Sequence, residues 1–438
     1  MKSRIACLAA ILGVALVLSP TEKAQAIPAF ARLYKTECNT CHTIFPDRNP
    51  FGDAFRKNSY VWPGNLPAQM EEGVQYTPPE GKGGEREWMV TIPDQVPISF
   101  WVNHDFIVNK DKVPQIDLDG ETELEVFTAG NFRGKAGWWA EYNFAPDREI
   151  GEVYLQFRKV FGSPVNVKAG RFKPRLSLWK SNDSATISSY GYNDMVVGLN
   201  PPVPQDQLDA AGATIGNPFT IDREQGGVEL NSVIGNRIFA AAGVVTPPEK
   251  DHNGVDYYGH LSVRIGGTDF NGSAPAISLV RESLWDNLAL TFGTFYYYGG
   301  SQNVLNNIDT NFQTVKFSNN FYRLGAESEV LYKNLRLRMN AIFGQDDNPR
   351  GAGGKSETSR FYMGQGQYIF MRNILGAMRF EYQDIEREGI TRRYIPTVVY
   401  APWQNVRLAL EYVHEIQPKF TQPHFINREY TARVTFAY

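Results

Sequence analysis

The chain has 438 residues, enough for one large domain with a small appendage or for two or three ordinary domains. Its 44 lysines and arginines nearly balance its 47 aspartates and glutamates, so the formal net charge is only −3. A weakly acidic chain has no electrostatic footprint for nucleic acid, which excludes nucleic-acid binding as its main function. Cysteine is nearly absent, with 3 residues, whereas aromatic residues make up 13% of the chain.

The first 26 residues have the three parts of a secretory signal peptide. Lys2 and Arg4 precede an apolar stretch at residues 5–18, and Ala24 and Ala26 form a small-x-small cleavage site. That stretch is shorter than the ~20 residues that a membrane-spanning helix needs. We therefore predict an exported protein whose mature chain begins near Ile27 and has no membrane-spanning helix.

The rest of the chain divides into three parts by composition. Residues 27–75 contain two cysteines and several aromatic residues, and residues 76–94 are rich in Pro, Gly and Glu, which predicts a linker. From residue 95 to residue 438 the apolar residues recur with period two, interrupted by short turns and longer polar loops.

The end of the chain shows this alternation most clearly. One face of the last segment carries Tyr430, Ala432, Val434, Phe436 and Tyr438, and the other face carries Thr431, Arg433, Thr435 and Ala437. Residues 287–297 and 405–416 alternate in the same way. A soluble β-sandwich or solenoid is the alternative, but strands of ~10 residues are long for those folds and typical of a transmembrane barrel.

Similar segments recur along the chain and predict an all-β fold, an antiparallel transmembrane β-barrel of about 16 strands, porin-like, with a small N-terminal α-helical cytochrome segment. The candidate strands begin near residues 96, 120, 136, 150, 164, 225, 236, 256, 287, 318, 334, 359, 375, 392, 404 and 425. If both termini are periplasmic, the short turns all lie on the periplasmic side. The long connections 172–224, 298–317 and 345–358 then lie outside, and residues 273–283 form an irregular periplasmic connection.

The third external connection, residues 173–224, is too long for an ordinary loop. Its lead-in, Gly170-Arg171-Phe172-Lys173-Pro174, resembles porins of the phosphate-selective type. That resemblance implies a loop that folds into the lumen and narrows it. The alternative is a disordered surface loop.

Cys38, Cys41 and His42 form the Cys-x-x-Cys-His signature that attaches a c-type haem. Two thiols three positions apart can reach the two vinyl groups of a porphyrin, and the adjacent imidazole can then ligate the iron. A zinc site would need two further ligands, a disulfide this short would constrain almost nothing, and a thioredoxin-type motif needs a βαβ context. We therefore predict one covalent haem c, with His42 as the metal ligand.

Aromatic residues surround the motif in the sequence. The nearby aromatic residues are Phe30, Tyr34, Phe45, Phe51, Phe55 and Tyr60. Phe51 and Phe55 would share one helix face and shield the haem from water.

Met70 and Met89 are the candidates for the sixth iron ligand, although an open site is an alternative. The strand parity of His104 puts it on the lipid side, and His252, His260, His414 and His424 are expected to be loop or surface residues.

The N-terminal segment resembles the fused monohaem cytochrome–porins, a family that includes outer-membrane iron oxidases of iron-oxidising bacteria. The residues that carry the resemblance are Pro28, Phe30-Ala31-Arg32, Cys38, Cys41, His42, Phe45-Pro46, Asn49, Phe51-Gly52, Phe55, Asn58 and Tyr60. Ser59 departs from the glycine expected before the tyrosine. The resemblance covers roughly a tenth of the chain and implies a haem held at or inside an outer-membrane barrel.

These observations predict an outer-membrane electron-transfer protein, with Fe(II) oxidase activity as one possible activity. An extracellular donor such as Fe(II) would supply the electrons, and a periplasmic c-type cytochrome would receive them. Outward electron flow, a solute porin with a tethered cytochrome and a peroxidase-like enzyme are alternatives. Since Fe(II) prefers oxygen and imidazole ligands, the external-loop candidates for guiding it are Asp117, Asp119, Glu249, Asp251, His252, Asp346 and Asp347.

Overall fold

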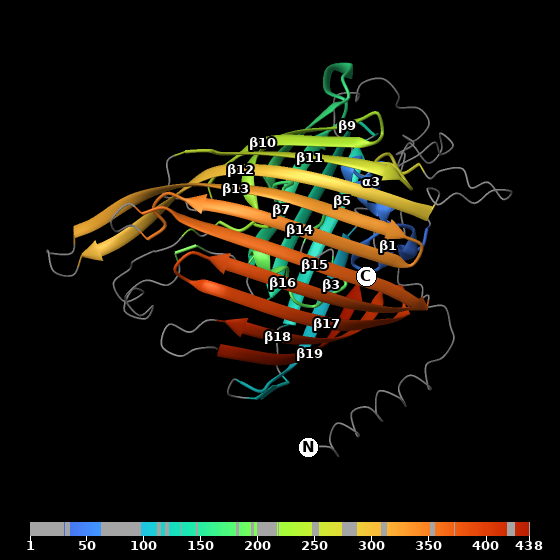
Figure 1. The fold of residues 1–438 in the computed structure, drawn as a ribbon. Helices are drawn as coiled ribbons and strands as arrows, with labels where there is room; N and C mark the ends of the chain where they lie inside the picture. Colours follow the sequence, from blue (N-terminus) through green and yellow to red (C-terminus); the bar gives the residue numbers. More distant parts are fainter. Residues whose placement is uncertain are drawn as a thin grey trace, which may run out of the picture.

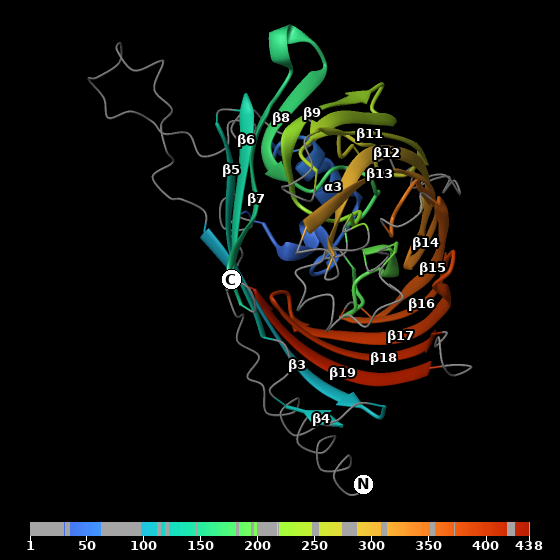
Figure 2. The same cartoon turned by 90° about the vertical axis from the view of Figure 1, so that its left-hand side faces the viewer.

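The computed structural model describes residues 30, 36–62, 98–111, 115–118, 122–132, 134–145, 148–180, 184–193, 197–198, 217, 219–247, 254–273, 287–307, 313–350, 355–371, 373–417 and 425–437. These residues form a closed antiparallel β-barrel with a small N-terminal segment inside it (Figures 1 and 2). The predicted signal peptide (residues 1–26) and linker (residues 76–94) lie outside the described residues.

Within the described residues, sixteen long strands form the barrel, as the sequence predicted. They are β3 (Ile98–Asn109), β5 (Thr122–Phe132), β6 (Ala136–Ala145), β7 (Glu149–Phe157), β8 (Val165–Phe172), β9 (Gln225–Ile234), β10 (Ile238–Val245), β11 (Asp256–Gly266), β12 (Leu288–Asn307), β13 (Gln313–Tyr332), β14 (Leu335–Asp346), β15 (Glu357–Met371), β16 (Ile374–Ile385), β17 (Gly389–Trp403), β18 (Val406–Gln417) and β19 (Phe425–Ala437). A two-residue strand, β4 (Ile116–Asp117), adds to β3, and β19 pairs with β3 to close the ring.

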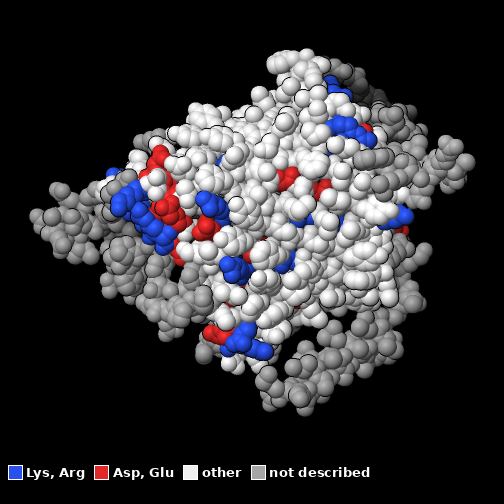
Figure 3. All heavy atoms as spheres, in the orientation of Figure 1, with Lys and Arg blue, Asp and Glu red and all other residues white. Residues whose placement is uncertain are grey.

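The two faces of the strands differ in exposure and polarity, as the alternation of apolar and polar residues predicts. In β19, Tyr430, Val434 and Phe436 are exposed on the outside, whereas Thr431 and Thr435 are buried on the inside. The outer surface in view is mostly uncharged, and its largest group of charged side chains lies towards the end from which the β12–β13 hairpin projects (Figure 3). An apolar exterior and a polar interior are what a transmembrane barrel requires. No helix among the described residues is long and apolar enough to cross a bilayer.

The strand boundaries differ from the prediction mainly at one hairpin. The connection expected at residues 298–317 is largely strand, because β12 continues to Asn307 and β13 begins at Gln313. The turns predicted to be short are short, and they meet at the opposite end of the barrel from this hairpin. Of the irregular connection predicted at residues 273–283, only Ser273 lies within the described residues, and it is not part of a strand.

The N-terminal segment is a compact plug, which we define as residues 36–62. It consists of the 3₁₀ turn η1 (Cys38–Thr40), the short strands β1 (His42–Ile44) and β2 (Asp47–Arg48), and one helix, α3 (Pro50–Lys57). Asn49 caps α3, since its side chain accepts a hydrogen bond from Gly52 N at 2.9 Å, and Pro50 occupies the first helical turn. The Cys-x-x-Cys-His motif therefore begins on a 3₁₀ turn and ends on β1, and residues 36–62 contain one α-helix, of 8 residues.

The connection between β8 and β9 folds into the lumen, as its resemblance to phosphate-selective porins implied. Three carboxylates on the inner wall hold its backbone. Leu178 N donates to Glu327 at 2.9 Å, Gly191 N donates to Glu381 at 2.9 Å, and Ile187 N donates to Glu411 at 2.7 Å. We call the described residues between 173 and 224 the inward loop. The plug and the inward loop therefore occupy the lumen together.

Candidate functional site

The plug is attached to the barrel wall on several sides at the short-turn end. Asp47 is fully buried and forms ion pairs with Arg336 at 2.5 Å and with Arg338 at 2.9 Å, both on β14. Tyr60 and Tyr154 of β7 share a hydrogen bond of 2.6 Å between their hydroxyl groups. Contacts with strands from different parts of the ring place the plug within the lumen.

A second set of contacts attaches the ends of the plug. Cys38 N donates to the Gln404 side chain at 2.8 Å, in the turn between β17 and β18. Arg158 donates to the Asn58 side chain at 2.7 Å, and Arg264 of β11 lies 3.4 Å from Asp53. Asp53 also pairs with Lys57 one turn further along α3. Burial lowers the pKa of Lys57 to about 8, against the opposing effect of Asp53.

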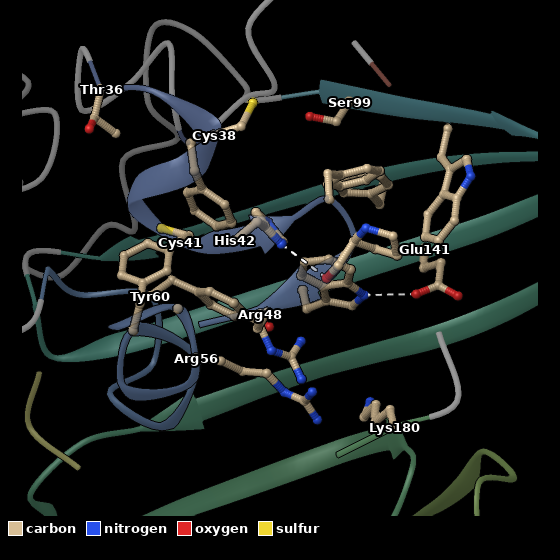
Figure 4. A pocket seen from close by; sticks show the side chains of 18 of the residues that line it. Thr36, Cys38, Cys41, His42, Arg48, Arg56, Tyr60, Ser99, Glu141 and Lys180 are labelled. Carbon is tan, nitrogen blue, oxygen red and sulfur yellow. Dashed lines mark hydrogen bonds between the residues drawn. The ribbon is translucent and has the colours of Figure 1, made fainter. Parts of the chain in front are cut away.

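A large cavity lies between the plug and the wall formed by β3, β5, β6 and β7. Including the open space at its mouth, it has an empty volume of about 1210 Å³. Cys38, Cys41 and His42 all line it. Figure 4 shows these three side chains together at the motif end of the cavity.

Both cysteines are free thiols in this structure; Cys38 is buried and Cys41 is half-buried. Burial raises the pKa of Cys38 to about 11 and that of Cys41 to about 12. Cys41 N donates to Cys38 O at 3.1 Å, which closes the 3₁₀ turn and turns both side chains to the same cavity. At neutral pH the two groups are protonated, so they are poor nucleophiles in the folded protein.

The imidazole of His42 is oriented by the backbone that follows it. Its Nδ1 lies 3.0 Å from the carbonyl oxygen of Pro46, and its ring packs edge-on against Phe45 at 5.1 Å between centroids. With the proton on Nδ1, Nε2 is the ring nitrogen that carries the lone pair. Histidines that ligate metals are commonly fixed in this way by a carbonyl oxygen.

The aromatic residues predicted around the motif are divided between two places. Phe45, Phe55 and Tyr60 line the cavity, together with Phe30. Phe51 does not line it but packs against Trp62 at 5.1 Å, and Phe55 reaches the same indole at 6.4 Å, so the two phenylalanines share a helix face as expected. Tyr34 lies outside the described residues.

The sequence analysis missed the barrel's contribution to this cavity. Trp101, Phe127 and Trp139 supply aromatic surface from three neighbouring strands. Trp139 stacks on Phe127 at 5.2 Å and on Tyr60 at 5.7 Å, so it joins the wall to the plug. Bulky aromatic residues at lumen-facing positions, such as Trp101 between the inward-facing Ser99 and Asn103, were the available signal.

Several residues with ionisable side chains also line this cavity. They are Arg48, Arg56, Glu125, Glu141, Glu152 and Lys180. Lys180 of the inward loop pairs with Glu152 of β7, and burial together with the nearby charge of Arg56 lowers its pKa to about 8. The Glu141 carboxylate accepts a hydrogen bond from Trp139 Nε1 at 3.1 Å.

The candidate sixth ligands and the remaining histidines do not line this cavity within the described residues. Met70 and Met89 are outside the described residues. His104 lies on the outer side of β3, next to Phe106, which agrees with its expected parity. His260, expected in a loop or on the surface, is instead buried in the lumen, 2.8 Å from Glu327, because it shares the inward parity of β11. His414 lies on the outer face of β18, and His252 and His424 are outside the described residues.

The acidic residues proposed to guide Fe(II) do not form one cluster in the described structure. Asp117 is exposed, but Asp346 ends β14 and is fully buried, 2.8 Å from Arg323, so its assignment to an external loop was wrong. Asp119, Glu249, Asp251 and His252 lie outside the described residues. No group of three or more His, Cys, Asp or Glu side chains that could hold a metal ion occurs among the residues that the structure describes.

Comparisons with known proteins identify the barrel. No family model matches the chain, and no curated protein matches it. An anion-selective porin from Comamonas acidovorans has a TM-score of 0.53 at 10% identity, over 78% of this chain and 99% of the porin. Outer-membrane expressed OmpT of Vibrio cholerae has a TM-score of 0.50 at 11% identity, over 80% of this chain and 100% of OmpT.

A third solved structure, Salmonella typhi OmpF in complex with daunomycin, has a TM-score of 0.50 at 11% identity, over 78% of this chain and 97% of OmpF. At these identities the likeness shows the fold alone. The chain has the closed, porin-like barrel fold of outer-membrane proteins.

Proposed function

We propose that this chain is an outer-membrane electron-transfer protein with one c-type haem bound inside its barrel. Cys38 and Cys41 would form the thioether bonds, and His42 would ligate the iron. One observation carries the proposal: both cysteines and His42 line a single cavity between the plug and the barrel wall. When bound, a c-type haem supplies reversible one-electron chemistry.

The residues present fit such a group. Its flat apolar faces would lie among Phe45, Phe55 and Trp101, which line the cavity. Pro46 O holds the His42 ring in an orientation suited to a metal ligand. The aromatic lining would exclude water, which is one means by which a protein raises a haem potential.

The position of the plug would allow one redox centre to serve two partners. The plug lies at the short-turn end, the end that faces the periplasm in our interpretation, and the inward loop lies beside it in the lumen. An extracellular donor would approach through the lumen, and a periplasmic c-type cytochrome would approach from the short-turn end. We propose Fe(II) as the donor because of the resemblance of residues 28–60 to iron-oxidising cytochrome–porins.

Redox titration followed by stopped-flow mixing with Fe(II) tests this function. The protein should be produced with the periplasmic haem-attachment machinery, and its covalent haem should be measured spectroscopically. We expect one haem per chain, and we expect Fe(II) to reduce it. His42→Ala should abolish the normal iron ligation, whereas the matched control His104→Ala, on the outer face of β3, should leave the spectrum unchanged.

The result that overturns the proposal is a folded barrel that carries no covalent haem under these conditions. A potential far below that of the iron couple would instead reverse the direction of flow, as in an outward conduit to extracellular acceptors.

A solute porin with a tethered cytochrome is the second candidate, favoured by the porin-like fold. It requires an open path through the lumen. The buried ion pairs between Asp47 and β14, and the inward loop held by wall carboxylates, narrow that path. Single-channel conductance of the haem-loaded protein distinguishes the two functions: porin-like conductance supports the solute porin, and a blocked lumen supports the conduit.

A further inference from the structure

The haem cavity has two chemically different ends. At one end, Cys38 lies beside Gln404, in a turn at the short-turn end of the barrel. At the other end, Arg48 and Arg56 extend their guanidinium groups in the same direction, towards the side where Lys180 lies (Figure 4). The cysteines and the arginines are therefore separated along the cavity.

Arg48, Arg56 and Lys180 also line a second, more polar cavity between the plug and the inward loop. Its empty volume is about 500 Å³. Its charged lining residues are Arg48, Arg56, Lys57, Arg175 and Lys180 on the positive side and Asp53 and Asp222 on the negative side. The excess of basic side chains makes this end of the haem cavity favourable for anions.

A c-type haem has its own polarity. Its thioether bonds lie towards one edge of the porphyrin, and its two propionate carboxylates lie at the opposite edge. With the thioethers at Cys38 and Cys41, the propionates must point away from the short-turn end. We propose that Arg48 and Arg56 bind these two carboxylates and so fix the orientation of the haem; this inference rests on the proposed function.

The remaining charged groups in the cavity support the same assignment. Glu125 and Glu141 project from the barrel wall, and neither carboxyl group offers the positive charge that a propionate needs. Arginine binds carboxylates through two parallel hydrogen bonds, which lysine cannot match, so a pair of arginines suits the two propionates.

This orientation separates the two routes to the haem. The thioether edge faces the short-turn end, where a periplasmic partner can approach. The propionate edge faces the second cavity and the inward loop. Since the two guanidinium charges stabilise the more negative, reduced state of the haem, they also raise its potential.

The test compares Arg48→Gln and Arg56→Gln with the charge-conserving Arg48→Lys and with Arg360→Gln, in the haem-loaded full chain. Arg360 is exposed on β15 and does not line the cavity, so its variant controls for the loss of one arginine charge. We expect both cavity variants to shift the propionate bending bands in the resonance Raman spectrum and to lower the midpoint potential. In Arg48→Lys, the midpoint potential should return closer to the wild-type value than the propionate bands do. Arg360→Gln should match the wild type in both measurements.

Unchanged propionate bands and potentials in both glutamine variants, with normal haem content, would overturn the inference while leaving the proposed function intact. Absence of haem from the wild-type protein would instead overturn the proposed function. If Arg48→Gln does not fold, as judged by the heat-dependent gel mobility of the barrel, Arg56→Gln and Arg48→Lys still decide the question.

Discussion

Gly52, in the first turn of α3, lies directly against the backbone of Cys41. A Cβ atom at position 52 would overlap the carbonyl oxygen of Cys41, and its next nearest neighbours are also backbone atoms of that residue. Because these neighbours are backbone atoms, no side-chain rotation could relieve the overlap. The helix can therefore pass beneath the Cys38–Cys41 turn only because residue 52 has no side chain.

Gly52→Ala should displace the Cys38–Cys41 turn from the helix and lower haem incorporation. Overpacking against a fixed backbone typically destabilises by about 1–3 kcal/mol, although alanine has the better helix propensity. The measurement is covalent haem per chain together with the thermal transition of the haem absorbance. Gly364→Ala, in β15, is the matched control, because a Cβ there meets no atom within 4 Å. Equal losses in the two variants would contradict the steric explanation.

Asp47 should be essential for retaining the plug in the lumen. The carboxylates of Asp47 and Glu329 together balance Arg336 and Arg338, so Asp47→Asn would leave these two buried cations with one counter-charge. Removing one partner of a buried ion pair typically destabilises by about 3–5 kcal/mol. We expect increased ion conductance through the reconstituted barrel and faster proteolysis of residues 36–62. The control is Asp111→Asn, which breaks an exposed pair with Arg428 and should leave conductance unchanged. A plug that stays closed in Asp47→Asn would show that its aromatic contacts suffice.

The thiols of the folded, haem-free protein should react slowly and only at high pH. Burial raises the pKa of Cys38 from 9.0 to about 11, so at pH 8 its thiolate fraction falls about 100-fold relative to the unfolded chain. Alkylation rates measured between pH 7 and 11 should keep rising across this range in the folded protein. In urea they should level off above pH 9, close to the ordinary thiol pKa. Equal folded and unfolded rates at pH 8 would mean that the cavity is open to solvent around the cysteines.

Much of the barrel could be predicted from the sequence, because each transmembrane strand has one face towards lipid and the other towards the polar lumen. The alternation in residues 430–438 assigned Tyr430 and Thr431 to opposite faces, and the structure agrees. The same rule would have placed His260 in the lumen, since it shares parity with Asp256 and Arg264. The β12–β13 hairpin was missed where it projects as a polar extension, because strands there need no apolar face.

The candidate site was only half predictable. Cys38, Cys41 and His42 form a local motif, so their spacing alone identified them. Trp101 and Trp139 reach the same cavity only because the closed ring places β3 and β6 next to the plug, and no local pattern specifies which strands face it. Arg48 and Arg56 became candidates only when the fold showed where the cavity ends.

The inward loop should open when its carboxylate anchors are removed. Glu411 accepts hydrogen bonds from Ile187 N at 2.7 Å and from Ser188 N at 2.8 Å, and it also accepts one from Thr397. Hydrogen bonds to a charged group contribute about 1.5–3 kcal/mol each, so Glu411→Ala should release this part of the loop. Because the plug remains attached through Asp47, we expect larger conductance fluctuations without loss of haem. Glu386→Ala removes an exposed carboxylate that accepts hydrogen bonds from the backbone N and the hydroxyl group of Thr358, and it should leave the conductance unchanged. If Glu411→Ala and Glu386→Ala conduct alike, the loop is held by its aromatic contacts, such as that of Tyr192 with Phe361 at 5.7 Å, and not by the carboxylate.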